Sequence, residues 1–116
     1  MNQEKDMNVE IETQGVEAVQ RISQLAQGCA GYELGTVEQQ VDQVKIRVAA
    51  IPETRRGRQT NCVVRVDFYD GGEAFAEATD ANPYVAIHWA LERVGRKIAR
   101  QGRRADASQR GLPDAA

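Results

Sequence analysis

The chain has 116 residues, a formal net charge of −2, two cysteines and one histidine. This length suits one two-layer domain and leaves no room for a second, and no apolar run approaches the roughly 18 to 20 residues of a membrane span. Acidic and amide side chains stand at the N-terminus, where a signal peptide would carry basic residues followed by an apolar run. We therefore expect a soluble, cytoplasmic protein with one folded domain over residues 1–104 and a disordered tail over residues 105–116.

The first third of the chain predicts one strand and one short helix. Residues 7–13 alternate between apolar and polar side chains, as a half-buried strand does. From Val19 onward apolar residues recur every three or four positions, which indicates an amphipathic helix that we expect to end near Gly28. The stretch 28–40 contains further glycines and shows no clear period, so its conformation is left open.

Three further strands are predicted over residues 41–51, 61–69 and 73–79, because each alternates in the same way. Pro52 ends the first of them, since proline lacks the N–H that a strand ladder needs. Asp70-Gly71-Gly72 supplies the positive-φ positions of a tight hairpin. In the last strand alanines face one way and Phe75 the other, which suits a helix lying close to the sheet.

A long helix is predicted after Asp80 or Asn82, either of which can cap it, and Pro83 suits its first turn. Its apolar stripe consists of Tyr84, Ile87, Leu91, Val94 and Ile98. We expect this stripe to pack on the sheet. The element order β-α-β-β-β-α thus predicts an α+β fold, a four-stranded sheet with two helices packed on one face.

Residues that carry catalysis are scarce. His88 is the only histidine, so neither a paired-histidine metal site nor a Ser-His-Asp set can be assembled from local motifs. Cys29 and Cys62 lack a second cysteine nearby, which argues against a metal knuckle or a redox pair and favours buried, reduced thiols. We therefore expect that the protein is not an enzyme and that it binds no cofactor, metal or small-molecule substrate.

Basic residues are segregated along the chain. Residues 1–40 hold seven acidic residues against two basic ones, and residues 67–82 hold five acidic residues and no basic one. The last helix carries six cations with no acid between them, namely Arg93, Arg96, Lys97, Arg100, Arg103 and Arg104. The loop before the third strand carries three more, Arg55, Arg56 and Arg58.

The spacing of Arg93, Lys97, Arg100 and Arg104 places them on one helical stripe. Arginine forks match phosphate oxygens and stack on bases, so the stripe favours contact with RNA or another polyanion. The alternative is an ordinary solvated helix face, helped by the preference of cations for a helix C-terminus.

The segment "VRVDFYDGGEAFAEATDANPYVAIHWALERVGRKIARQGRR", residues 64–104, and the element order resemble the ribosome hibernation promoting factor family, also called ribosome-associated inhibitor or protein Y. The matching features are a final strand entering an acidic turn, Tyr84 followed by Ala86 and Ile87, and a long helix with Leu91 and a basic end. Looser similarity extends over residues 7–104.

The resemblance implies a domain that sits on the small ribosomal subunit, in the channel of messenger and transfer RNA, and silences translation under stress. It also implies that cations of both helices face ribosomal RNA. Carried over by position, these are the six cations of residues 93–104, whereas the first helix offers only Arg21. Family members usually have a longer and more basic first helix. The short tail implies a short-type factor that acts as a monomer or with another ribosomal factor.

Two other hypotheses stay open. The fold can have lost ribosome binding and serve as a protein-interaction module, through an exposed sheet face with Lys45, Arg47, Arg65 and Phe75. The chain can also bind RNA generically, in the manner of a double-stranded-RNA module, although its extra N-terminal strand argues against this.

Overall fold

The computed structural model describes residues 7–52 and 54–103, so the expectations for residues 1–6, for Arg104 and for the tail 105–116 lie outside the described residues. Within the described ranges the chain forms four strands, two α-helices and one 3-10 helix. Their bounds are β1 (Val9–Gln14), α1 (Val19–Leu34), η2 (Gly35–Gln40), β2 (Val41–Ile51), β3 (Gln59–Phe68), β4 (Glu73–Asp80) and α2 (Pro83–Arg100).

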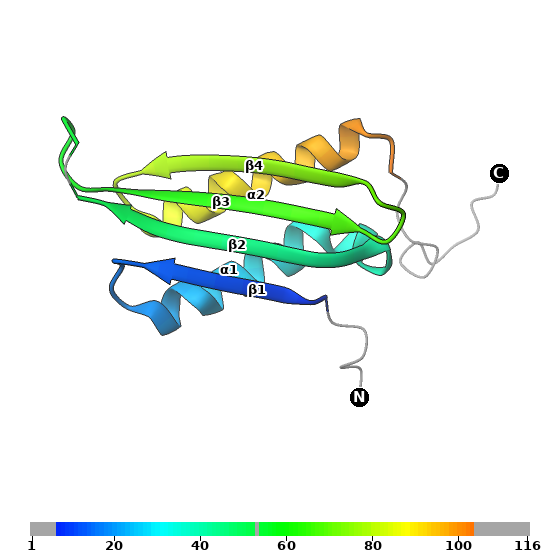
Figure 1. Ribbon diagram of the computed structural model, residues 1–116, viewed down its shortest axis with the longest axis horizontal. Helices are drawn as coiled ribbons and strands as arrows, with labels where there is room; N and C mark the ends of the chain where they lie inside the picture. Colours follow the sequence, from blue (N-terminus) through cyan, green and yellow to red (C-terminus); the bar gives the residue numbers. More distant parts are fainter. Residues whose placement is uncertain (1–6, 53, 104–116) are drawn as a thin grey trace.

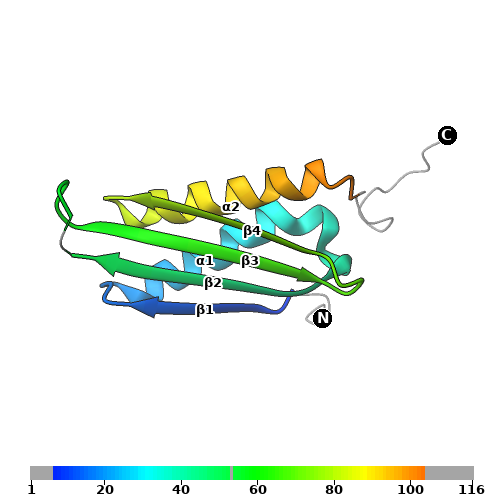
Figure 2. The ribbon, with the colours of Figure 1, turned by 45° about the horizontal axis from the view of Figure 1, so that its top comes forward.

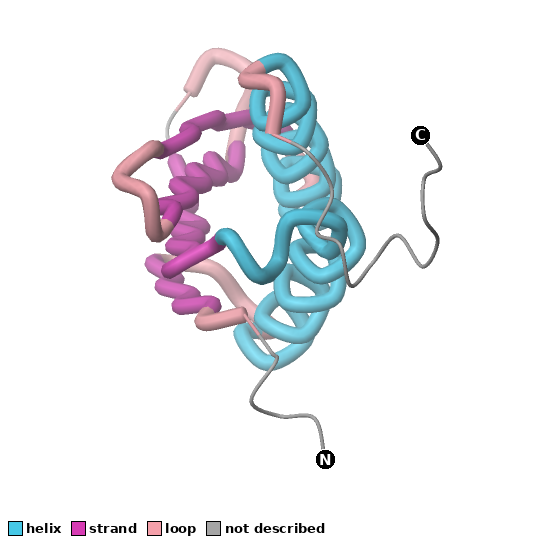
Figure 3. The backbone as a smooth tube through the Cα atoms, turned by 90° about the vertical axis from the view of Figure 1, so that its right-hand side faces the viewer, coloured by secondary structure: helices cyan, strands magenta, loops and turns pink. Residues whose placement is uncertain are grey.

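The strands form one sheet in the order β1-β2-β3-β4, with β1 parallel to β2 and the other neighbours antiparallel (Figure 1). A parallel neighbour requires a crossover connection, and α1 provides it between β1 and β2. Both helices cover the same face of the sheet, as the end-on view in Figure 3 shows. The predicted α+β fold is confirmed.

The core lies between the helices and the covered face of the sheet. Alternate residues of β2, β3 and β4 point into it, among them Ile46, Val64 and Ala76, which are almost fully buried. The alanines of β4 face the buried stripe of α2, and their small side chains let the helix lie close to the strand. Cys62 is buried in this core and Cys29 is half-buried, both as free thiols; burial raises the pKa of Cys62 to about 12.

The expectation that the first helix ends near Gly28 is wrong, because α1 continues to Leu34. Its buried residues step by four as far as Leu34, so the buried stripe supports the additional turns. Gly28 and Gly31 lie on the exposed side, where a Cβ would meet nothing within 4 Å. The rest of the unassigned stretch is η2. The first helix is therefore not short, although it is poor in cations.

The β3–β4 hairpin differs from its prediction in one residue. Gly71 has a φ of 94°, as a tight turn requires, whereas Gly72 is outside the positive-φ region. Within the described part of the chain, neither α1 nor α2 combines the length and the apolar character of a membrane-spanning helix.

Candidate nucleic-acid interface on the last helix

The N-terminus of α2 is fixed by the residues that precede it. Asn82 accepts a hydrogen bond from the Tyr84 N–H at 2.8 Å, and Asp80 accepts one from the Asn82 N–H at 2.9 Å. Pro83 occupies the first turn, where its missing N–H has no helical partner to lose. The predicted start of the helix is confirmed, and the buried stripe that follows fixes which side of α2 faces solvent.

Two α2 side chains and that of Gln101, the residue that follows the helix, cover the free edge of the sheet. Because β4 is an edge strand, the carbonyls that point away from β3 have no ladder partner. These three side chains are four residues apart and reach alternate carbonyls of β4, since one helical turn and two strand residues advance by similar distances of about 5 to 7 Å. Figure 2 shows α2 running beside β4. The bonds join Arg93 Nη1 to Glu77 O at 2.8 Å, Lys97 Nζ to Phe75 O at 2.6 Å, and Gln101 Nε2 to Glu73 O at 3.0 Å.

Arg103 fastens the end of α2 to the β3–β4 hairpin. Its guanidinium donates to both carboxylate oxygens of Asp70, at 3.0 and 3.2 Å, and lies 3.5 Å from the centre of the Phe68 ring. The side chain of Arg103 is only 14% exposed. The hydrogen bond from Arg103, with a second from the Gly72 N–H, lowers the pKa of Asp70 below its ordinary value. A Cβ on Gly72 would collide with this guanidinium. Arg103 is therefore engaged within the fold.

Arg96 and Arg100 face solvent. Arg96 pairs with Glu92 at 3.0 Å, four residues earlier, yet its side chain is 63% exposed. Arg100 is exposed and has no hydrogen bond or ion pair with any described residue. Arg93 is also exposed, although one of its N–H groups is held by β4.

Trp89 shares this side of α2. At about 100° per residue, positions 89, 93, 96 and 100 fall within about 60° of the helix circumference. The indole is 43% exposed. We name this surface the arginine face and define it as Trp89, Arg93, Arg96 and Arg100. Sequence reasoning missed Trp89, although its spacing of four and seven residues from Arg93 and Arg96 was a usable signal.

The basic loop lies elsewhere. Arg55 and Arg56 are exposed in the β2–β3 connection, at the end of the sheet where α2 begins, far from the C-terminal end of α2 (Figure 1). Arg58 donates to the Gly15 carbonyl at 2.8 Å and so ties this connection to the segment that leads into α1. The structure does not bring the loop arginines together with Arg96 and Arg100.

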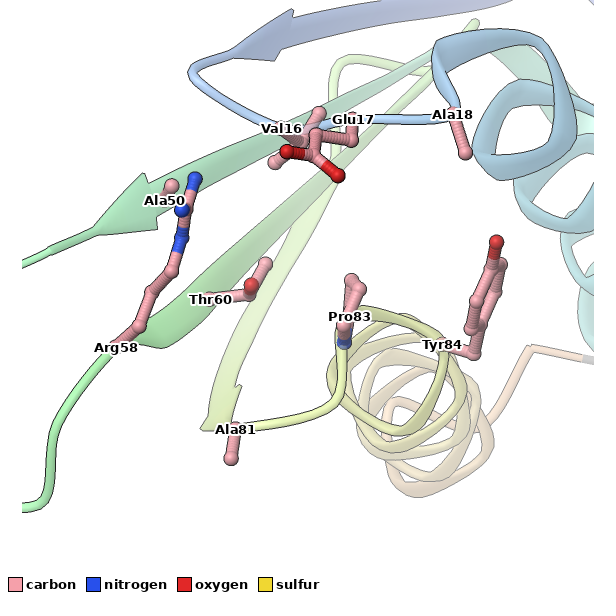
Figure 4. Close-up of a pocket in the computed structure, with 9 residues that line it drawn as sticks. All are labelled: Val16, Glu17, Ala18, Ala50, Arg58, Thr60, Ala81, Pro83 and Tyr84. Carbon is pink, nitrogen blue, oxygen red and sulfur yellow. The ribbon is translucent and has the colours of Figure 1, made fainter.

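Arg58 also lines a pocket of about 340 Å³ at the start of both helices (Figure 4). Glu17, Thr60 and Tyr84 supply its other polar groups, and the remaining walls are small apolar side chains. None of the described residues that line it is a histidine, cysteine or serine.

On α1, Arg21 is exposed and is the only basic residue of the helix. The open face of the sheet is better balanced, because its cations have acidic or amide neighbours. Arg65 forms ion pairs with Asp67 at 3.1 Å and Glu73 at 2.7 Å, and Arg47 donates to Gln14 at 2.8 Å. Unbalanced positive charge among the described residues is therefore concentrated on α2 and in the β2–β3 connection.

Comparison with protein-family models finds no match, and comparison with curated protein sequences finds none. Solved structures do share the fold. A ribosomal subunit interface protein from Coxiella burnetii superposes with a TM-score of 0.68 and 11% identity, covering 83% of this chain and 98% of that chain. The protein Y N-terminal domain from Thermus thermophilus gives a TM-score of 0.62 and 20% identity, covering 82% and 99%. At these identities the likeness establishes a common fold.

Proposed function

We propose that this chain is a non-enzymatic, cytoplasmic ribosome-binding factor of the hibernation type, which contacts small-subunit ribosomal RNA and lowers translation. The fold is that of a ribosomal subunit interface protein and of a protein Y domain, over nearly the whole length of both. The arginine face supplies a surface for the phosphate backbone.

The observation that carries the proposal is the exposed, acid-poor arginine face. Arg100 has no partner among the described residues, and Arg96 has only Glu92. A guanidinium with unused N–H donors binds phosphate oxygens in a fork geometry. Lys97 and Arg103 have their own partners in the fold, so we assign them no main role in the contact.

Because α1 has few cations, the number of phosphate contacts that we expect is small. With Arg21 alone on α1, the arginine face makes most of the phosphate contacts, and Arg55 and Arg56 add some at the other end of the molecule. We therefore expect modest affinity that falls with salt, because each phosphate contact contributes about 0.7 to 0.9 to the slope of log K against log salt.

The test is co-sedimentation with ribosomes and with separated small subunits at low and moderate salt. R96Q/R100Q removes two exposed cations that make no backbone contact, and K45Q/R47Q removes two from the open face of the sheet as a matched control. We expect saturable binding, weakened by R96Q/R100Q with a salt slope smaller by about 1.5, and unchanged by K45Q/R47Q. No binding by the unaltered protein at low salt rejects the proposal.

A second candidate is a protein-interaction module that uses the open face of the sheet. The observation in its favour is Phe75, which is 48% exposed and lies in register with Arg65 and Lys45 across three strands. Loss of partner binding in K45Q/R47Q, with no effect of R96Q/R100Q, would support this candidate.

We propose that the protein acts as a monomer, and a tight dimer in native mass spectrometry would contradict that.

A further inference from the structure

Trp89 is a half-exposed indole on the side of α2 that also carries Arg93, Arg96 and Arg100. It is the only tryptophan of the chain and is 43% exposed, so folding leaves much of its apolar surface in water. Arg93, Arg96 and Arg100 follow it along the same side of α2, and Glu92 is the one acid among residues 89–100. An aromatic surface beside several cations matches a ligand that has flat rings and negative charge.

The indole is also in contact with a neighbouring ring. The His88 and Trp89 rings meet edge to face, with centroids 5.3 Å apart and planes at 71°. His88 in turn lines a pocket between α1 and α2, together with Leu25 and Cys29.

We propose that Trp89 stacks on an unpaired RNA base while Arg93, Arg96 and Arg100 hold the adjoining phosphates. Stacking requires a base that is not enclosed in a duplex, since the flat faces of paired bases are covered by their neighbours. The arginine face therefore selects unpaired RNA over duplex RNA. This inference rests on the proposed function and names the form of RNA that the same site recognises.

A protein partner is the less favoured occupant. Tryptophan and arginine are common at the centres of protein interfaces, but such centres bury apolar area. Among the described residues of α2, Trp89 is the only large apolar side chain that is well exposed. Three arginines against Glu92 favour a polyanion with evenly spaced charges.

Because Trp89 is the sole tryptophan, its fluorescence reports on the site directly. The unaltered protein is titrated at low salt with oligoadenylate and with a blunt RNA duplex of the same length. We expect saturable quenching by oligoadenylate and little by the duplex. By anisotropy of labelled RNA, W89L weakens oligoadenylate binding about tenfold and leaves duplex binding unchanged, because leucine keeps apolar bulk but cannot stack.

F75L is the matched control, since Phe75 is exposed to a similar degree on the opposite face of the sheet. Equal oligoadenylate affinity of W89L and the unaltered protein overturns the inference, and so does a larger loss in F75L. Ribosome co-sedimentation separates the two proposals. If W89L and the unaltered protein sediment alike and bind RNA alike, only the stacking inference fails. If the unaltered protein binds neither ribosomes nor RNA, both fail.

Discussion

Single residues of the same type have different roles in this molecule, depending on what each side chain reaches. Arg103 and Arg100 are three residues apart, yet Arg103 is held by Asp70 and Phe68 while Arg100 has no partner among the described residues. The sequence groups them as one basic cluster. It cannot separate them, because the position of Asp70 relative to the end of α2 depends on how the hairpin and the helix pack.

The Asp70–Arg103 pair predicts a pH dependence of stability. Arg103 lowers the pKa of Asp70 in the folded state, so the stabilisation is fully present above the unfolded value of about 3.9 and is lost as pH falls through the lowered, folded value. We expect D70N to be less stable than the unaltered protein from neutral pH down to about pH 5, with the difference vanishing in stronger acid. Urea denaturation across this range measures it.

R103M serves as a companion variant, because it keeps an apolar stem over Phe68 and removes the charge. Its stability should follow that of D70N in pH dependence. A difference between the unaltered protein and D70N that persists in strong acid would contradict this prediction, because protonated Asp70 has no charge for Arg103 to pair with and the amide of D70N can still accept from the Gly72 N–H.

At the scale of elements, α2 protects β4. The pattern of apolar residues in α2 is strong enough to be predicted from the sequence, as are its cap and its packing on the sheet. The contacts of Arg93 and Lys97 with β4 carbonyls are not, because they require knowing that β4 is an edge strand and which of its carbonyls point outward. The row of cations therefore divides into side chains that bond to β4 and side chains that face solvent, and the sequence alone does not distinguish the two.

Removing this edge contact should destabilise the domain. We expect R93A/K97A to lower the free energy of unfolding by about 1 kcal/mol for each lost hydrogen bond and to promote self-association, since uncovered strand edges pair with other chains. Urea denaturation and dynamic light scattering measure the two effects. R96A/R100A removes the same charge from the same helix without touching β4. An equal loss of stability in R96A/R100A would mean that the lost contacts with β4 are not what destabilises R93A/K97A.

Helix α1 shows why its end could not be predicted. Gly28 and Gly31 are poor helix formers, and the sequence does not reveal that the buried stripe through Ala30 and Leu34 continues to pack. We expect G28A and G31A to raise stability by about 1 kcal/mol each, because a Cβ meets nothing within 4 Å at either position.

Gly95 provides the control for these glycines. A Cβ there would lie 3.0 Å from a carboxylate oxygen of Glu33, where α1 and α2 approach each other closely. G95A should therefore gain less stability than G28A or lose some, and thermal denaturation of the three variants ranks them. A larger gain for G95A would mean that close helix packing does not constrain this position.

At the scale of the whole molecule, positive charge is divided between places that the fold keeps apart. The arginine face occupies α2, and Arg55 and Arg56 extend from the end of the sheet where α2 begins (Figure 1). The outer surface of α1 carries glutamines instead of cations, including the exposed Gln24 and Gln27. A ligand that covers both helices would meet few cations on α1.

This asymmetry allows a gain-of-function prediction. If RNA lies across the helical layer, Q24K/Q27K adds two cations to the contact surface and should strengthen ribosome binding several-fold at low salt, with a salt slope larger by about 1.5. Q14K/T79K adds the same charge to the open face of the sheet and should change neither quantity. Co-sedimentation over a salt series measures both. An equal gain in ribosome affinity in the two variants would mean that net charge attracts the protein to RNA and that no particular face is used. A gain in Q14K/T79K alone would place the contact on the open face of the sheet.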